Sequence, residues 1–132
     1  HLQDQYPVRL SGGEKQRVLL ARAIAQDTDY IFLDETLSFL DINHQIEIMQ
    51  ILRQINLEKK KSILIVSHNV NLSIEYSDRI IVMKKGNLIA DGTPQNIISE
   101  DLIKSVFNID LHIVQNPYTE KPLLLYSKGN PQ

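Results

Sequence analysis

The sequence contains no cysteine, which excludes disulfide bonds and thiolate metal sites and fits a protein of the reducing cytosol. It also lacks an excess of one charge, because 14 Lys and Arg residues against 16 Asp and Glu residues give a formal net charge of -2. This balance gives no indication of a basic surface for nucleic acid or for an anionic membrane. We therefore expect no nucleic-acid partner.

Long apolar runs are absent too. No run approaches the ~20 residues that a membrane-spanning helix needs, and the opening segment HLQDQYPVRL lacks the pattern of a signal peptide. We therefore expect any membrane role to be mediated by a partner. The chain opens on His1 rather than Met, which suggests a fragment or a processed product. Its 132 residues, 42% of them hydrophobic, suffice for one domain or a piece of one.

The first half of the chain has the pattern of alternating helices and strands. Ser11, followed three residues later by Glu14, has the spacing of a helix capping box. The segment after it is apolar on almost every side, which predicts a buried helix. The run YIFL at residues 30–33 is continuously apolar, as expected of a parallel strand covered on both faces. Asp41 then caps a second predicted helix.

A second apolar run, SILIV at residues 62–66, leads to His68. Strand, helix and strand in this order form a βαβ unit, whose two strands run parallel. Asp34, Glu35 and His68 are therefore expected at the carboxyl edge of one sheet, where open α/β sheets bind ligands. The predicted fold class is α/β, with a partial parallel sheet of the P-loop NTPase type flanked by helices.

The second half of the chain predicts smaller elements. They are a helix near residues 69–76, a hairpin turning at Lys85-Gly86-Asn87, a short helix capped by Thr93, another starting at Ser99, and a terminal hairpin turning at residues 116–121. The weakest boundary lies near Gly92. We therefore divide the chain into residues 1–92 and a small α+β extension, residues 93–132.

Two glycines, Gly12 and Gly13, lie where the first helix is expected to begin. The N–H groups of a helix N-terminus and the positive end of its dipole attract anions. A simple capping box with a flexible lead-in explains the same residues. The basic run Lys59 to Lys61 is expected to be a solvated loop before the second strand.

Asp34 and Glu35 follow a predicted strand directly. They fit a solvated pair at a strand end. A carboxylate withdrawn from water, however, is destabilised unless a cation or hydrogen bonds compensate for the lost hydration. A divalent ion such as Mg²⁺ supplies that compensation, while the neighbouring acid accepts a proton from an attacking water or orients it.

His68, considered by itself, fits a hydrogen-bonded structural histidine. On the same edge as the two acids it becomes a candidate donor to a transferring phosphoryl group. The other histidines, His1, His44 and His112, lack metal-ligand spacing.

The segments LSGGEKQR, YIFLDE, SFLD and SH occur in a characteristic order and spacing. The chain resembles the second half of the nucleotide-binding domain of ATP-binding-cassette (ABC) proteins, and it looks most like the ATPases of importers for ferric siderophores, haem or cobalamin. The resemblance covers the chain from about residue 6 to residue 98. It implies ATP hydrolysis that drives import of an iron chelate or a related substrate.

The resemblance also implies residue roles. Asp34 matches the Walker B aspartate that holds Mg²⁺, Glu35 the catalytic carboxylate and His68 the switch histidine. Residues 10–14 match the family signature, in which Ser11, Gly12, Gly13 and Glu14 meet nucleotide held by an opposite subunit. Residues 38–41 match the D-loop, whose Asp41 links the two sites.

The implied partners are a second nucleotide-binding subunit in a head-to-tail dimer, transmembrane permease subunits and an extracytoplasmic substrate-binding protein. The implied location is the cytoplasmic face of the cell membrane. These expectations, like ATP and Mg²⁺ as cofactors, come from the resemblance.

The sequence departs from the family pattern in two main ways. It contains no G-x-x-x-x-G-K-[ST] motif, the loop that cradles the β- and γ-phosphates. We therefore expect this chain alone to have no appreciable ATPase activity. Thr36 and Leu37 follow Glu35 where the family usually has Pro and then Thr or Ser, and the loss of the fixed proline φ predicts a looser turn with the chemistry retained.

Two other function classes remain open. A chromosome-maintenance or repair ATPase also carries an LSGGEK signature, although the downstream segment DRIIVMKKGNLIADG resembles a transporter hairpin. A coiled-coil arm with sustained heptads would mark the chromosome class. A non-catalytic interaction module would explain the missing phosphate loop, and nucleotide binding by the intact gene product separates it from an ATPase.

Overall fold

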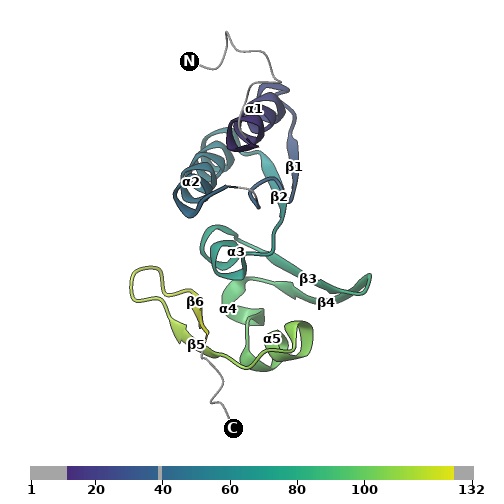
Figure 1. Ribbon diagram of the computed structural model, residues 1–132, viewed down its shortest axis with the longest axis vertical. Coiled ribbons are helices and arrows are strands. Elements are labelled where there is room, and N and C mark those ends of the chain that lie inside the picture. Colours follow the sequence, from purple (N-terminus) through teal and green to yellow (C-terminus); the bar gives the residue numbers. More distant parts are fainter. Residues whose placement is uncertain (1–11, 39, 127–132) are drawn as a thin grey trace. The chain divides into compact units, whose positions relative to one another are not determined.

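The structure is a computed structural model that describes residues 12–38 and 40–126 (Figure 1). The chain forms two compact units and passes from the first to the second between His68 and Asn69. Each unit has its own strand pairs and its own buried residues. The division proposed near Gly92 stays a prediction.

The first unit contains a βαβ arrangement preceded by a helix. Its elements in chain order are α1 (Gly12–Ala25), β1 (Tyr30–Asp34), α2 (Ile42–Lys59) and β2 (Ser62–Val66). The two strands pair in parallel, with Tyr30 opposite Ser62 and Asp34 opposite Val66. The α/β fold class and the parallel pairing are confirmed, because β2 returns beside β1 after the α2 crossover.

One face of β1 is packed and the other is open. Ile31 and Leu33 are buried, as are Ile48, Met49 and Leu52 of α2. Tyr30 and Phe32, which alternate with them, are 65% and 69% exposed. The expectation of a strand covered on both faces is therefore wrong for the described residues, which pack onto one side of it.

Helix α1 is less enclosed than its composition predicts. Leu20 is buried, but Val18 and Leu19 are exposed. A helix that is apolar on all sides needs neighbours on all sides, and the described part of the chain covers α1 mainly around Leu20. The prediction of a fully buried helix is wrong for these residues.

Lys61 corrects a third expectation. Its side chain is buried, with Nζ 2.9 Å from Oδ1 of Asp27, and it donates a 2.6 Å hydrogen bond to the carbonyl of Thr28. Lys59 and Lys60 are exposed, as expected, but Lys59 is the last residue of α2 rather than part of a loop. Because β1 and β2 are parallel, the residue before β2 lies beside the residues before β1, and this places Lys61 against the loop that carries Asp27.

The described part of the second unit, residues 69–126, contains two antiparallel hairpins and three short helices. Its elements are α3 (Val70–Tyr76), β3 (Ile80–Lys84), β4 (Asn87–Gly92), α4 (Pro94–Ile97), α5 (Glu100–Phe107), β5 (His112–Gln115) and β6 (Pro122–Leu125). Lys85 and Gly86 join β3 to β4 with φ of 50° and 79°. Two successive positive φ angles suit the twist of a tight hairpin, so the predicted turn is confirmed.

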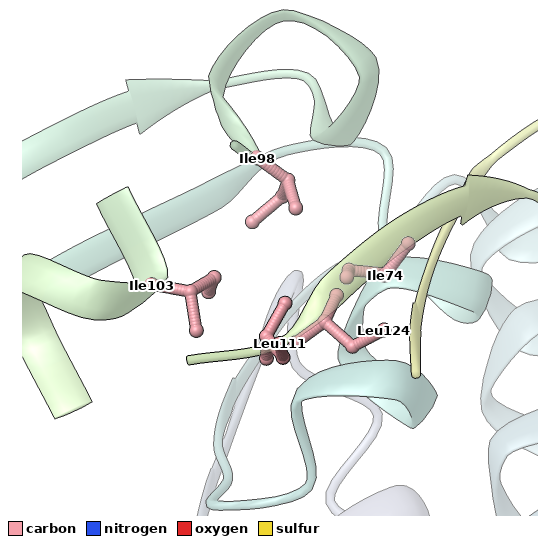
Figure 2. Packing of buried hydrophobic residues seen from close by; sticks show 5 residues of the cluster. All are labelled: Ile74, Ile98, Ile103, Leu111 and Leu124. Carbon is pink, nitrogen blue, oxygen red and sulfur yellow. The ribbon is translucent and has the colours of Figure 1, made fainter. Parts of the chain in front are cut away.

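A compact apolar cluster holds the second unit together. Ile74, Ile98, Ile103, Leu111 and Leu124 converge in it from helices, loops and a strand (Figure 2). The side-chain amide of Asn71, in α3, makes two hydrogen bonds to the backbone of Leu124. It donates to the Leu124 carbonyl at 3.0 Å and accepts from the Leu124 N–H at 2.8 Å. The terminal hairpin is thus attached to α3 by packing and by hydrogen bonds. No helix within residues 12–38 and 40–126 is long and apolar enough to cross a membrane.

Candidate functional site

The candidate site lies where β1 and β2 end. Glu35 follows the last residue of β1, and its N–H donates to the carbonyl of Val66 at 3.1 Å, which continues the parallel ladder by one bond. His68 lies two residues beyond β2. Its Nε2 is 2.6 Å from Oε1 of Glu35. The structure therefore brings together the two residues proposed as catalytic.

The backbone of Glu35 has an uncommon conformation. Its φ of 47° lies in the left-handed region, which costs a residue other than glycine about 1–2 kcal/mol. The turn is closed by a 3.1 Å hydrogen bond from the N–H of Ser38 to the carbonyl of Glu35. Five other non-glycine residues of the described chain also have a positive φ, so this conformation marks a tight turn after β1.

The contact between Glu35 and His68 is open to solvent. Their side chains are 49% and 75% exposed. An ionised carboxylate only accepts hydrogen bonds, so Nε2 carries the proton that joins the pair. Exposed ion pairs contribute little to the free energy of unfolding. The effect of the Glu35–His68 contact is to fix the two side chains relative to each other.

Exposure also changes the case for a metal at Asp34. Asp34 ends β1 and is exposed, as Glu35 is, so hydration rather than burial surrounds both carboxylates and the expected burial penalty does not apply to the described chain. Among residues 12–38 and 40–126 there is no group of three or more His, Cys, Asp and Glu side chains able to hold a metal ion. Mg²⁺ commonly takes one or two carboxylates together with substrate phosphates and water. A single carboxylate such as Asp34 fits that mode.

The glycine turn opens α1. Gly12, Gly13 and Glu14 form the first turn of this helix, whereas the predicted cap Ser11 lies outside the described residues. A Cβ atom on Gly13 would lie 3.3 Å from Cδ2 of Leu40. This distance is shorter than most contacts of real side chains, so a glycine at this position lets the start of α1 approach the segment before Asp41 closely.

Asp41 is the N-cap of α2, as predicted. Its Oδ1 accepts from the N–H of His44 at 3.0 Å, and its Oδ2 lies 2.7 Å from Nδ1 of the same residue. The backbone N–H of His44, and then its ring, lower the pKa of Asp41 below the ordinary value of 3.8.

Two residues near Asp41 were missed by sequence reasoning. Both His44 and the neighbouring Gln45 bind the segment that follows Glu35. A signal was present, because a residue three positions after an N-cap is well placed to reach back to it. In the sequence, the spacing of His44 argues against a metal ligand and indicates no other role.

The comparisons with known proteins agree with these motifs. A family model described as ABC transporter matches residues 1–38. The chain is 41% identical over 124 residues to the achromobactin transport ATP-binding protein CbrD of Dickeya dadantii, a match that covers 93% of this chain and 46% of that protein. It is 44% identical over 116 residues to the iron(3+)-hydroxamate import ATP-binding protein FhuC of Bacillus subtilis, covering 88% of this chain and 43% of that protein.

Solved structures match as well. A transporter assigned to the metal-chelate ABC type, in an inward-facing conformation, aligns with a TM-score of 0.82 and 27% identity over 96% of this chain and 51% of that one. The dimeric ABC transporter cassette MJ0796 aligns with a TM-score of 0.64 and 35% identity over 67% of this chain and 38% of that one. The chain thus spans about half the length, or less, of the proteins it matches. The chain is therefore similar, over nearly all of its own length, to ATP-binding proteins of ABC transporters.

Proposed function

We propose that the protein containing this chain hydrolyses ATP to drive import of an iron chelate, such as a ferric siderophore, through separate membrane subunits. The observation that carries this proposal is the 2.6 Å contact between Glu35 and His68 at the carboxyl ends of two parallel strands. The names of the relatives support the substrate class, because they include achromobactin transport, iron-hydroxamate import and petrobactin import.

Glu35 acts on the attacking water in this proposal. A carboxylate has about four lone-pair sites on its two oxygens, so Glu35 can bind His68 through Oε1 and still accept from a water molecule. That water loses a proton as it attacks the terminal phosphate, and Glu35 orients it or receives the proton. The exposed carboxylate is open to both water and substrate.

His68 positions Glu35 and stabilises the transferring group. Its Nε2–H is the hydrogen that holds the carboxylate. The second ring nitrogen becomes a donor when the imidazole is protonated, and a donor directed at a phosphoryl oxygen stabilises the charge that develops there.

Asp34 would hold Mg²⁺, directly or through water. When bound, the ion neutralises charge on the β- and γ-phosphates. Asp34 contributes to this by ending β1 one residue before Glu35, so that the metal ligand and the catalytic carboxylate follow each other along the chain.

The signature turn and the D-loop would act across a dimer. Ser11, Gly12, Gly13 and Glu14 would meet nucleotide held by a second copy, and Asp41 would link the two sites. One of the matched structures is itself a dimeric cassette. The further partners proposed are permease subunits and an extracytoplasmic substrate-binding protein, with this subunit at the cytoplasmic face of the membrane.

The proposal is tested on the intact protein. We expect Mg²⁺-dependent ATP turnover by the purified protein, and loss of ferric siderophore uptake in cells that lack its gene. Failure to bind nucleotide would favour the interaction module, and uptake that persists without the gene would remove the transport role. The 132-residue chain lacks the G-x-x-x-x-G-K-[ST] motif, so its turnover alone should be negligible. Robust activity of that piece would contradict the expectation that turnover needs this motif.

A further inference from the structure

We infer that His44 and Gln45, in the first turn of α2, are positioning residues that hold the turn before Asp41 in the geometry needed for turnover; the segment meant is residues 37, 38, 40 and 41, which includes the described part of the D-loop. The inference rests on the proposed function, because it assigns a purpose to Asp41 and to the turn that follows Glu35. It is carried by four hydrogen bonds made by two adjacent residues.

Gln45 holds the backbone of the segment. Its Nε2 donates to the carbonyl of Leu37 at 3.1 Å and to the carbonyl of Leu40 at 2.9 Å. A side-chain amide has two N–H groups, so each carbonyl receives its own donor. One side chain therefore joins the two ends of the turn that precedes Asp41.

The same turn is continuous with the catalytic carboxylate. The N–H of Ser38 donates to the carbonyl of Glu35, and the N–H of Leu40 donates to the carbonyl of Leu37, each at 3.1 Å. Leu37 accordingly accepts both from the backbone and from Gln45. A shift of Leu37 would be transmitted through this pair of turns to Glu35.

His44 holds the side chain of Asp41. An N-cap carboxylate needs one backbone donor to cap its helix, and here the N–H of His44 supplies it to Oδ1. The ring of His44 binds the other oxygen, with 2.7 Å between Nδ1 and Oδ2. Because both oxygens are held, rotation of the carboxylate group is restricted as well as its position.

These contacts also compensate for the absence of the family's usual proline after Glu35. Thr36 and Leu37 replace the usual Pro and Thr, and a looser turn is the expected result. In the structure the turn is closed by hydrogen bonds, and the side chains of Leu37 and Leu40 are buried beneath it. The order that a proline would supply through its fixed φ is supplied here by Gln45 and by packing.

The test for Gln45 uses the intact protein and two isosteric charge changes on one helix. Gln45→Glu replaces the donating amide with a carboxylate that faces two carbonyl oxygens, whereas Gln50→Glu makes the same change at an exposed position of α2. We expect Gln45→Glu to lower kcat roughly 10- to 100-fold, the scale of a misplaced catalytic group, with a smaller change in KM. Amide hydrogen exchange over residues 35–41 should become faster, and Gln50→Glu should leave both readouts unchanged.

The test for His44 uses rescue. His44→Ala should lower kcat and the cooperativity of ATP hydrolysis, and His44→Gln, which keeps a side-chain donor three residues after the cap, should restore most of both. A purely structural role would reduce the melting temperature without this rescue of cooperativity. If the Gln45→Glu variant does not fold, Gln45→Leu takes its place in the comparison with Gln50→Glu. Leucine removes the two N–H donors without adding a negative charge.

The outcomes separate the inference from the proposed function. A wild-type protein that does not turn over ATP refutes the proposed function, while hydrogen exchange at residues 35–41 still tests the positioning. Wild-type kcat, cooperativity and exchange in both the Gln45 and the His44→Ala variants would overturn the inference.

Discussion

Nε2 of His68 lies 2.6 Å from Oε1 of Glu35, although 33 positions separate the two residues in the sequence. The contact exists because β1 and β2 are parallel and in a register that places Asp34 opposite Val66. Both residues belong to the first unit. The pair therefore depends on one crossover, through α2.

The first prediction concerns Glu35, the proposed catalytic carboxylate. Glu35→Gln keeps the shape of the side chain and an oxygen for His68, but it removes the proton acceptor. We expect turnover by the intact protein to fall by about 10²–10⁴-fold, while ATP binding persists and a nucleotide-bound dimer accumulates in size-exclusion chromatography. Glu47→Gln, at an exposed position of α2, is the matched control, and equal turnover in the two variants would remove Glu35 from its role.

The second prediction concerns the metal ligand. Asp34→Asn removes one negative charge from the end of β1. We expect the Mg²⁺ concentration at half-maximal turnover to rise at least ~10-fold, equivalent to about 1.4 kcal/mol of binding free energy. ATP binding measured without Mg²⁺ should change little. A variant with the wild-type Mg²⁺ dependence would show that Asp34 is not a ligand.

The third prediction concerns the core of the second unit. Ile103 is 2% exposed and belongs to the cluster drawn in Figure 2. Ile103→Ala should lower the free energy of unfolding by about 2–5 kcal/mol, because it removes buried methylene groups and leaves a cavity. Ile81→Ala, at an exposed position of β3, should change it by no more than ~0.5 kcal/mol. Urea denaturation of the intact protein measures both, and similar losses would contradict the assigned core.

The fourth prediction concerns pH. The guanidinium of Arg79 donates to both carboxylate oxygens of Asp91, at 2.7 and 2.6 Å, and these hydrogen bonds lower the pKa of Asp91 below its ordinary value of 3.8. The pair therefore contributes its full stabilisation above the ordinary pKa, and that contribution is lost as the pH falls through the lowered pKa of the folded state.

Arg79→Gln should return the pKa of Asp91 toward 3.8. Carboxyl NMR titration of Asp91 measures this change directly. Arg22→Gln, which alters an exposed arginine in the last turn of α1, should leave the titration as in the wild type. An Asp91 pKa that does not move in Arg79→Gln would show that the bidentate contact does not persist in solution.

Much of the local structure followed from the sequence. Asp41 caps a helix where predicted, because a cap needs only a short polar side chain and the N–H groups of the next turn. The Lys85-Gly86 turn followed in the same way, since a tight hairpin needs residues at positive φ. These features depend on a few neighbouring residues, and a sequence displays them directly.

Burial was predicted less well. Composition favoured an enclosed α1 and a doubly covered β1, but Leu19 and Phe32 are exposed. Lys61 shows the opposite error, since a basic run looks solvated until the parallel register places one of its members against Asp27. Burial depends on what lies across from a residue, and spacing along the chain does not report that.

By itself the sequence determined which motifs are present, in what order, and that Glu35 and His68 each follow a strand, because apolar runs, caps and turn residues act over a few positions. Only the tertiary structure decided that these two side chains touch and that His44 and Gln45 hold the segment between Glu35 and Asp41. Such contacts are fixed by the register of β1 against β2 and by the position at which α2 begins, and both are properties of the packed chain.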